Sequence, residues 1–97
     1  MLLKSWTERE IWDQDMAWLA QSKAVVAECT VPSLGVGYEL GIAEKLGLPC
    51  LVLFRGREED RKLSAMLGGN PKMRVVYYSQ ISEACEAVDA FLRNTIQ

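Results

Sequence analysis

The sequence contains no histidine. This absence excludes the Ser-His-Asp and Cys-His arrangements of nucleophilic catalysis and removes most zinc sites. The three cysteines, Cys29, Cys50 and Cys85, form no Cys-x-x-Cys motif and lie among apolar neighbours. We therefore expect buried free thiols in a reducing compartment rather than a disulfide framework. Any catalysis must rest on carboxylates, hydroxyls, backbone amides or basic side chains.

A strong excess of one charge is also missing, as are long apolar runs. The chain carries 11 basic and 13 acidic residues, a formal net charge of −2. A protein that binds the phosphate backbone of nucleic acids usually has an excess of basic residues, and this chain has none. No apolar run approaches the ~20 residues that cross a bilayer. We therefore expect neither a nucleic-acid polymer nor a membrane as partner, and we expect a cytoplasmic protein, with the nucleus as the alternative.

The 97 residues have the composition of a globular chain and predict one domain over residues 1–97. A capping box of Thr7 and Glu10 begins the first expected helix. Alternating helices and strands predict an α/β fold with a parallel sheet between two helical layers, of the flavodoxin or Rossmann type. Helices are expected over residues 7–21, 36–46 and 58–67 and after a cap at Ser79, and strands over residues 23–29, 50–54 and 74–78.

Such a sheet has few strands, since doubly wound domains usually have about five. Parallel sheets also need both faces and both edges covered. Two explanations remain open at this point. Either a partner chain completes the sheet, or the chain lacks an N-terminal strand.

A loop rich in glycine follows the first expected strand. It has the sequence Pro-Ser-Leu-Gly-Val-Gly and leads into the helix over residues 36–46. Gly35 and Gly37 allow a ligand to approach the backbone closely, Ser33 adds a hydroxyl donor, and a helix N-terminus attracts anions. The loop therefore predicts a phosphate-binding site at the carboxyl edge of the sheet. The alternative is that serine and glycine serve turn geometry alone.

Two carboxylates are placed unusually. Glu39 is expected in the first turn of its helix, where the helix dipole favours the ionised form, and this position beside an anion site suggests a nucleophile. Asp15 falls within the apolar stripe of the first helix, where an unpartnered carboxylate costs several kcal/mol. Two such groups near one cleft predict glycosidic chemistry with a nucleophile and an acid. The alternatives are an ordinary helical glutamate, and an Asp15 that is satisfied by a backbone amide or a tryptophan N–H. The stripe itself consists of Ile11, Trp12, Met16, Trp18 and Leu19.

Three segments carry a resemblance to a known family. Residues 13–19, 25–28 and 32–41, the last reading Pro-Ser-Leu-Gly-Val-Gly-Tyr-Glu-Leu-Gly, resemble the nucleoside 2-deoxyribosyltransferase family. Within it they are most similar to the 2′-deoxynucleoside 5′-monophosphate N-hydrolases. The run Leu-Ser-Ala-Met at residues 63–66 is similar too.

The resemblance implies hydrolysis of the N-glycosidic bond of deoxynucleoside monophosphates, giving free base and 2-deoxyribose 5-phosphate. It implies that Glu39 attacks C1′ to form a covalent deoxyribosyl-enzyme and that Asp15 assists departure of the base. It further implies no metal or organic cofactor.

The resemblance also implies how the substrate is bound. Ser33, Gly35 and Gly37 match the loop around the 5′-phosphate and the sugar. Ser64 matches a serine that reaches the phosphate in the neighbouring subunit of a homodimer.

The chain departs from the family pattern at its start. Family members begin with a further strand and a glycine-rich loop, and this sequence begins after them, so an N-terminally truncated domain without a central strand is expected. Two other functions stay open: transfer of deoxyribose to another base, and a non-catalytic remnant that binds nucleotides or dimerises. The presence of both Glu39 and Asp15 favours an enzyme.

Overall fold

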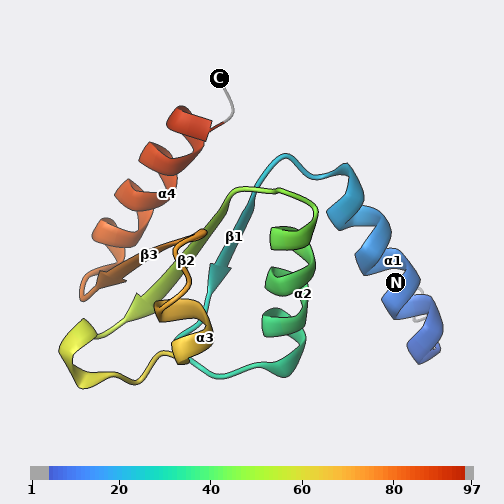
Figure 1. The fold of residues 1–97 in the computed structure, drawn as a ribbon, viewed down its shortest axis with the longest axis horizontal. Coiled ribbons are helices and arrows are strands. Elements are labelled where there is room, and N and C mark those ends of the chain that lie inside the picture. The colour runs from blue at the N-terminus through green and yellow to red at the C-terminus, as the bar shows by residue number, and fades with distance from the viewer. Residues whose placement is uncertain (1–4, 96–97) are drawn as a thin grey trace.

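The computed structural model describes residues 5–95, in which helices and strands alternate along the chain (Figure 1). The three strands form one parallel sheet in the order β1-β2-β3, so the predicted α/β fold is confirmed. No helix within residues 5–95 is long and apolar enough to cross a membrane. The elements are α1 (Glu8–Gln21), β1 (Val25–Glu28), α2 (Leu34–Lys45), β2 (Cys50–Arg55), the 3-10 turn η1 (Glu58–Asp60), α3 (Ala65–Gly68), β3 (Met73–Tyr78) and α4 (Ile81–Thr95).

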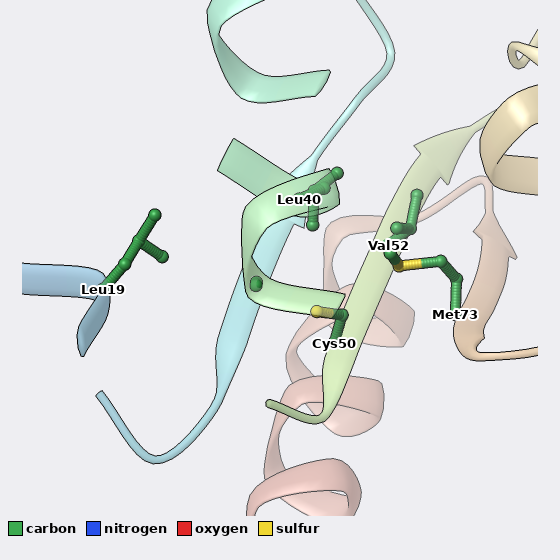
Figure 2. Packing of buried hydrophobic residues seen from close by; sticks show 6 residues of the cluster. Leu19, Leu40, Cys50, Val52 and Met73 are labelled. Atoms are coloured by element: carbon green, nitrogen blue, oxygen red, sulfur yellow. The ribbon is translucent and has the colours of Figure 1, made fainter. Parts of the chain in front are cut away.

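The central strand β2 is covered on both faces, as the sequence predicts for a sheet between helical layers. Its side chains alternate, and Figure 1 shows α2 and α4 on opposite sides of the sheet. Cys50 and Val52 pack toward α2, whereas Leu51 and Leu53 pack toward α4. Figure 2 shows the cluster on the α2 side, with a side chain of α1 reaching it from outside. This cluster consists of Leu19, Leu40, Ala43, Cys50, Val52 and Met73.

The sheet has no gap between its strands. Val25 of β1 pairs with Cys50 of β2, and Cys50 pairs with Met73 of β3 on its other side. Within residues 5–95 the three strands pair directly with one another, and the expected further N-terminal strand stays a prediction. Among the described residues, the unpaired edges are the outer ones of β1 and β3.

Helix α1 begins as predicted but packs differently. The Thr7 hydroxyl accepts a hydrogen bond from the Glu10 N–H, and the Glu10 carboxylate accepts one from the Thr7 N–H, which confirms the capping box. The expected burial of the apolar stripe is wrong, because only Leu19 is buried and Trp12 and Trp18 are 47% and 61% exposed. The sheet is narrow and α2 covers its face, so α1 lies on the outer side of α2 (Figure 1).

Three further predictions fail for local reasons. The continuous helix expected over residues 58–67 is broken, because Arg61 adopts a left-handed conformation (φ 52°) between η1 and α3. Ser79 does not accept the capping bond of α4; instead Glu83 reaches back and accepts hydrogen bonds from the N–H and hydroxyl of Ser79. Cys50 is buried and Cys29 half-buried, but Cys85 is exposed on α4.

A hydrogen-bond network ties together the carboxyl ends of all three strands. The Glu28 carboxylate accepts hydrogen bonds from the Thr30 hydroxyl at 2.5 Å and the Tyr78 hydroxyl at 2.6 Å. The Thr30 hydroxyl oxygen also accepts one from the Arg55 N–H at 2.8 Å. Partial burial opposes ionisation of Glu28, but these donors together bring its pKa below the ordinary value. The network fixes the start of the loop that leads to Ser33.

We expect Tyr78→Phe to destabilise the fold by about 1–2 kcal/mol, because it removes a hydrogen bond to a charged acceptor. The pKa of Glu28 is lowered in the folded state, so this contribution is complete above the ordinary value of 4.5 and is lost as the pH falls through the folded-state pKa. Urea unfolding at pH 7 and pH 3 measures both effects. Tyr77→Phe removes a hydroxyl from the adjacent residue and is the matched control; an equal loss in both variants contradicts the assigned network.

Candidate active site

Helix α2 places the loop residues and Glu39 at the carboxyl edge of the sheet. Ser33 is its N-cap, and the Ser33 hydroxyl oxygen accepts a hydrogen bond from the Val36 N–H at 3.2 Å. The helix begins at Leu34, two residues earlier than predicted. Glu39 therefore falls in the second turn, and the expectation that it lies in the first turn is wrong. Its side chain is thus beyond the turn on which the helix dipole acts most strongly.

The structure brings Asp15 of α1 and Glu39 of α2 together. Both side chains are half-buried and line one groove of about 510 Å³. Partial burial raises the pKa of Glu39, and Asp15 raises it further as a hydrogen-bond partner and as a like charge. Asp15 accordingly faces Glu39 rather than the core. The pKa of Glu39 is raised, whereas the helix dipole was expected to favour its ionised form.

A second groove of about 660 Å³ lies next to the first, between the loop after β1 and the segment before α3. We call the groove with Asp15 and Glu39 the carboxylate groove, and the second one, lined by Ser33, Lys62 and Ser64 among others, the loop groove. Leu34 and Tyr38 line both grooves. A ligand that passes these two residues can reach into both grooves.

The residues expected in the site divide between the two grooves. The carboxylate groove contains Gly35 in addition to the two acidic residues, and the loop groove contains Ser33, Gly37 and Ser64. Ser64 thus shares a groove with Ser33 of its own chain, and its predicted contact across a subunit boundary stays a prediction. Within residues 5–95, no group of three or more histidine, cysteine, aspartate or glutamate side chains could hold a metal ion.

Local geometry leaves donors and space in the loop groove. The Ser64 hydroxyl oxygen accepts a hydrogen bond from the Met66 N–H at 3.2 Å, as Ser33 does from Val36, so each hydroxyl keeps its proton to donate. A Cβ at Gly37 would meet no atom within 4 Å, and the backbone there is not left-handed. Neither packing within the chain nor backbone conformation requires glycine at this position, which fits close approach by a ligand.

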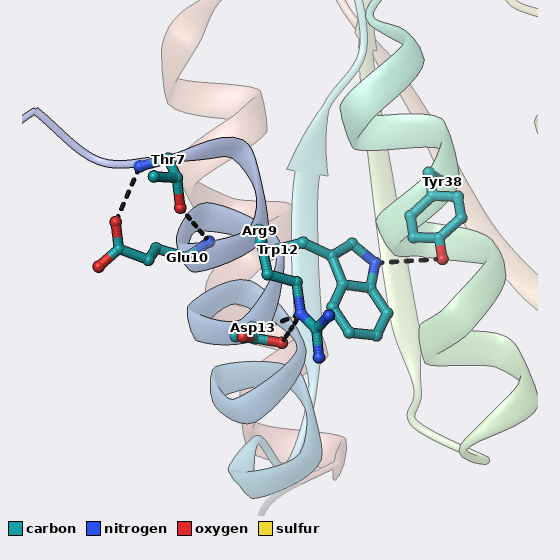
Figure 3. A network of polar contacts seen from close by, with 6 residues as sticks. All are labelled: Thr7, Arg9, Glu10, Trp12, Asp13 and Tyr38. Carbon is teal, nitrogen blue, oxygen red and sulfur yellow. Dashed lines mark hydrogen bonds and ion pairs between the residues drawn. The ribbon is translucent and has the colours of Figure 1, made fainter.

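Sequence reasoning missed two aromatic residues of the carboxylate groove. Trp12 and Tyr38 both line it, and the Trp12 indole N–H donates a hydrogen bond to the Tyr38 hydroxyl at 3.3 Å (Figure 3). Trp12 was expected in the buried stripe. Its position three residues before Asp15 was the available signal, because residues three apart share a helix face.

Comparison with known proteins gives relatives of one kind. No protein-family model matches the sequence. A 5-hydroxymethyl-dUMP N-hydrolase of Mus musculus is 59% identical over 59 residues, 61% of this chain and 34% of the relative. A protein of Thermofilum pendens provisionally named 2′-deoxynucleoside 5′-phosphate N-hydrolase 1 is 36% identical over 95 residues, 96% of this chain and 66% of the relative.

The chain belongs to the 2′-deoxynucleoside 5′-phosphate N-hydrolase family. A further relative with that provisional name, from Syntrophotalea carbinolica, is 40% identical over 73 residues, 75% of this chain and 51% of the relative. The family resemblance predicted from residues 13–19, 25–28 and 32–41 is thus confirmed. The chain spans about one third to two thirds of the length of these N-hydrolases.

We expect Asp15→Asn to raise the melting temperature of this chain at pH 7 by about 1–4 °C, the size of a like-charge repulsion removed from a small domain. The pKa of Glu39 is raised in the folded state, so ionising Glu39 lowers the stability of the fold. This loss of stability is absent below the ordinary pKa of 4.5 and complete above the folded-state pKa. The gain should therefore disappear near pH 4. Thermal unfolding at both pH values measures it. Asp13→Asn on the same helix is the control, and an equal gain in that variant argues against the carboxyl pair.

Proposed function

We propose that this chain contributes the catalytic carboxylates for hydrolysis of the N-glycosidic bond of 2′-deoxynucleoside 5′-monophosphates. The observation that carries the proposal is the pairing of Asp15 and Glu39 from two helices in one groove. Retaining glycosidases use two adjacent carboxyl groups. One is the nucleophile that attacks the anomeric carbon, and the other is the general acid and base. The names of the related N-hydrolases support the same bond and the same class of substrate.

The reaction proceeds in two steps. First, the one proton of the carboxyl pair lies on Asp15 when the substrate is bound. The Glu39 carboxylate attacks C1′ while the C1′–N bond breaks, and Asp15 gives its proton to the departing base. The deoxyribosyl group is then an ester of Glu39. Second, water attacks C1′, the Asp15 carboxylate takes a proton from this water, and the C1′–O bond to Glu39 breaks. The products are the free base and 2-deoxyribose 5-phosphate, and both carboxyl groups return to their starting states.

The 5′-phosphate is proposed to bind in the loop groove. Its donors are the Ser33 and Ser64 hydroxyls, and Lys62 is a cation on its lining. Gly37 provides room for close approach. Charge separates the two grooves, because the carboxylate groove has acidic side chains and would repel a phosphate dianion.

We expect Glu39→Gln to reduce base release from deoxyguanosine monophosphate by more than a hundredfold, because loss of covalent catalysis costs several kcal/mol at about 1.4 kcal/mol per tenfold. Chromatographic detection of free guanine measures it. Glu86→Gln on exposed α4 is the matched control and should leave the rate unchanged. More than about a tenth of the rate in Glu39→Gln contradicts the nucleophile. Added adenine in the same assay detects transfer to a second base instead of to water.

We further propose that the chain acts as a homodimer in the cytoplasm or the nucleus. The outer edges of β1 and β3 are unpaired among the described residues, and α1 exposes Ile11, Trp12 and Trp18. Both features favour association of a small parallel-sheet domain. The free cysteines favour a reducing compartment.

We expect Ser64→Ala to lower kcat/KM for deoxyguanosine monophosphate about tenfold and to leave deoxyguanosine unaffected, because a hydrogen bond to a charged phosphate is lost. Mixing this variant with Glu39→Gln tests the subunit boundary. If Ser64 acts across a symmetric dimer, mixed dimers regain one intact site, and activity returns to about a quarter of the wild type. No recovery, with a dimer by light scattering, assigns Ser64 to the site of its own chain.

A further inference from the structure

We propose that Trp12 binds the nucleobase of the substrate by stacking, so that the base lies in the carboxylate groove and the phosphate in the loop groove. The inference rests on the proposed function. It adds the direction in which the substrate lies across the two grooves and the residue that recognises its base.

The aromatic and acidic side chains of the carboxylate groove are placed in matching pairs. On α1, Trp12 precedes Asp15 by one helical turn, and on α2, Tyr38 directly precedes Glu39. All four line the groove. The nucleobase is bonded to C1′. When C1′ lies within reach of Glu39, the base therefore lies near an aromatic ring on the side of α1 (Trp12) and on the side of α2 (Tyr38).

The Trp12 ring is held in place and is accessible. Its N–H donates to the Tyr38 hydroxyl at 3.3 Å, and Figure 3 shows the indole of α1 directed toward the Tyr38 ring of α2. The two residues remain 47% and 51% exposed. The Arg9 guanidinium lies 6.0 Å from the centroid of the Trp12 ring, but Arg9 does not line the groove. The other face of the indole is the one that we propose receives the base.

Charge determines which end of the substrate enters which groove. Glu8, Asp15 and Glu39 line the carboxylate groove, and no lysine or arginine of residues 5–95 does. A phosphate dianion is repelled there, whereas a neutral, planar base is not. Lys62 lines the loop groove, which favours the phosphate. Leu34 and Tyr38, which line both grooves, are then next to the sugar.

Stacking on an aromatic side chain suits every base, because each has a flat π-face. Trp12 should therefore strengthen the binding of any nucleobase. Its effect should depend on the presence of a base and not on the sugar or the phosphate. This dependence separates a stacking role from a structural one.

The test compares binding of two probes by isothermal titration calorimetry. Deoxyguanosine monophosphate carries the base, and 2-deoxyribose 5-phosphate lacks it. We expect Trp12→Ala to weaken the binding of deoxyguanosine monophosphate about fivefold or more. The affinity for 2-deoxyribose 5-phosphate should change less than twofold. Trp12→Phe keeps an aromatic face and should retain most of the affinity. Trp18→Ala, on the same helix and outside both grooves, should bind both probes as the wild type does.

The outcomes separate this inference from the proposed function. If the wild type binds and hydrolyses deoxyguanosine monophosphate and Trp12→Ala binds it equally well, the stacking role is wrong and the function stands. If Trp12→Ala binds both probes equally more weakly than the wild type does, Trp12 has a structural role and the inference is wrong. If the wild type binds neither probe and releases no base, the proposed function and the inference fall together.

Discussion

Burial of β2 on both faces is the constraint on which the rest of the structure depends. Its side chains alternate between two apolar clusters, so α2 and α4 must lie on opposite sides of the sheet. Strands joined through such helices run parallel, and their carboxyl ends meet at one edge. The network of Glu28, Thr30 and Tyr78 closes that edge. The loop that starts there carries Ser33 and leads directly into the helix of Glu39.

Helix α1, which contributes Asp15 to the candidate site, is packed poorly against the rest of the fold. Helix α1 buries Leu19 and part of Met16, while several of its larger apolar side chains stay exposed. The same helix brings Asp15 against Glu39, an arrangement that raises the pKa of Glu39 and opposes folding at neutral pH. The hydrogen bond from Trp12 to Tyr38 is a favourable contact between these two helices. Helix α1 thus buries little apolar surface while it carries Trp12 and Asp15 of the carboxylate groove.

The sequence predicts the parts of the fold that depend on local pattern. The strands follow from short β-branched runs, and α2 follows from Leu40 and Ala43 on one face, both fully buried. The break at Arg61 was not predictable, because a left-handed non-glycine residue carries no pattern of its own. The hydrogen bond between Glu28 and Tyr78 was not predictable either, since it joins residues 50 positions apart.

The site shows a different kind of failure. Asp15 was singled out because a carboxylate within an apolar stripe needs a partner, and the structure places Glu39 beside it rather than a backbone amide or a tryptophan N–H. The stripe was taken as a buried face, and this assumption concealed Trp12 as a groove residue. Amphipathic periodicity shows which residues share a face and does not show what covers that face. On a sheet of three strands, one helix is enough to cover the side that α1 was expected to share.

The pairing of the two carboxyl groups has a consequence for the proposed reaction. Partial burial raises the pKa of Glu39, and Asp15 raises it further as a hydrogen-bond partner and as a like charge. In glycosidic cleavage the sugar acquires positive charge in its oxocarbenium-like transition state. A C1′ that carries positive charge beside Glu39 favours the ionised form of Glu39, which the free pair disfavours. In the proposed reaction this attraction arises in the transition state and not on binding of the neutral sugar, which is the condition for an interaction to accelerate a reaction.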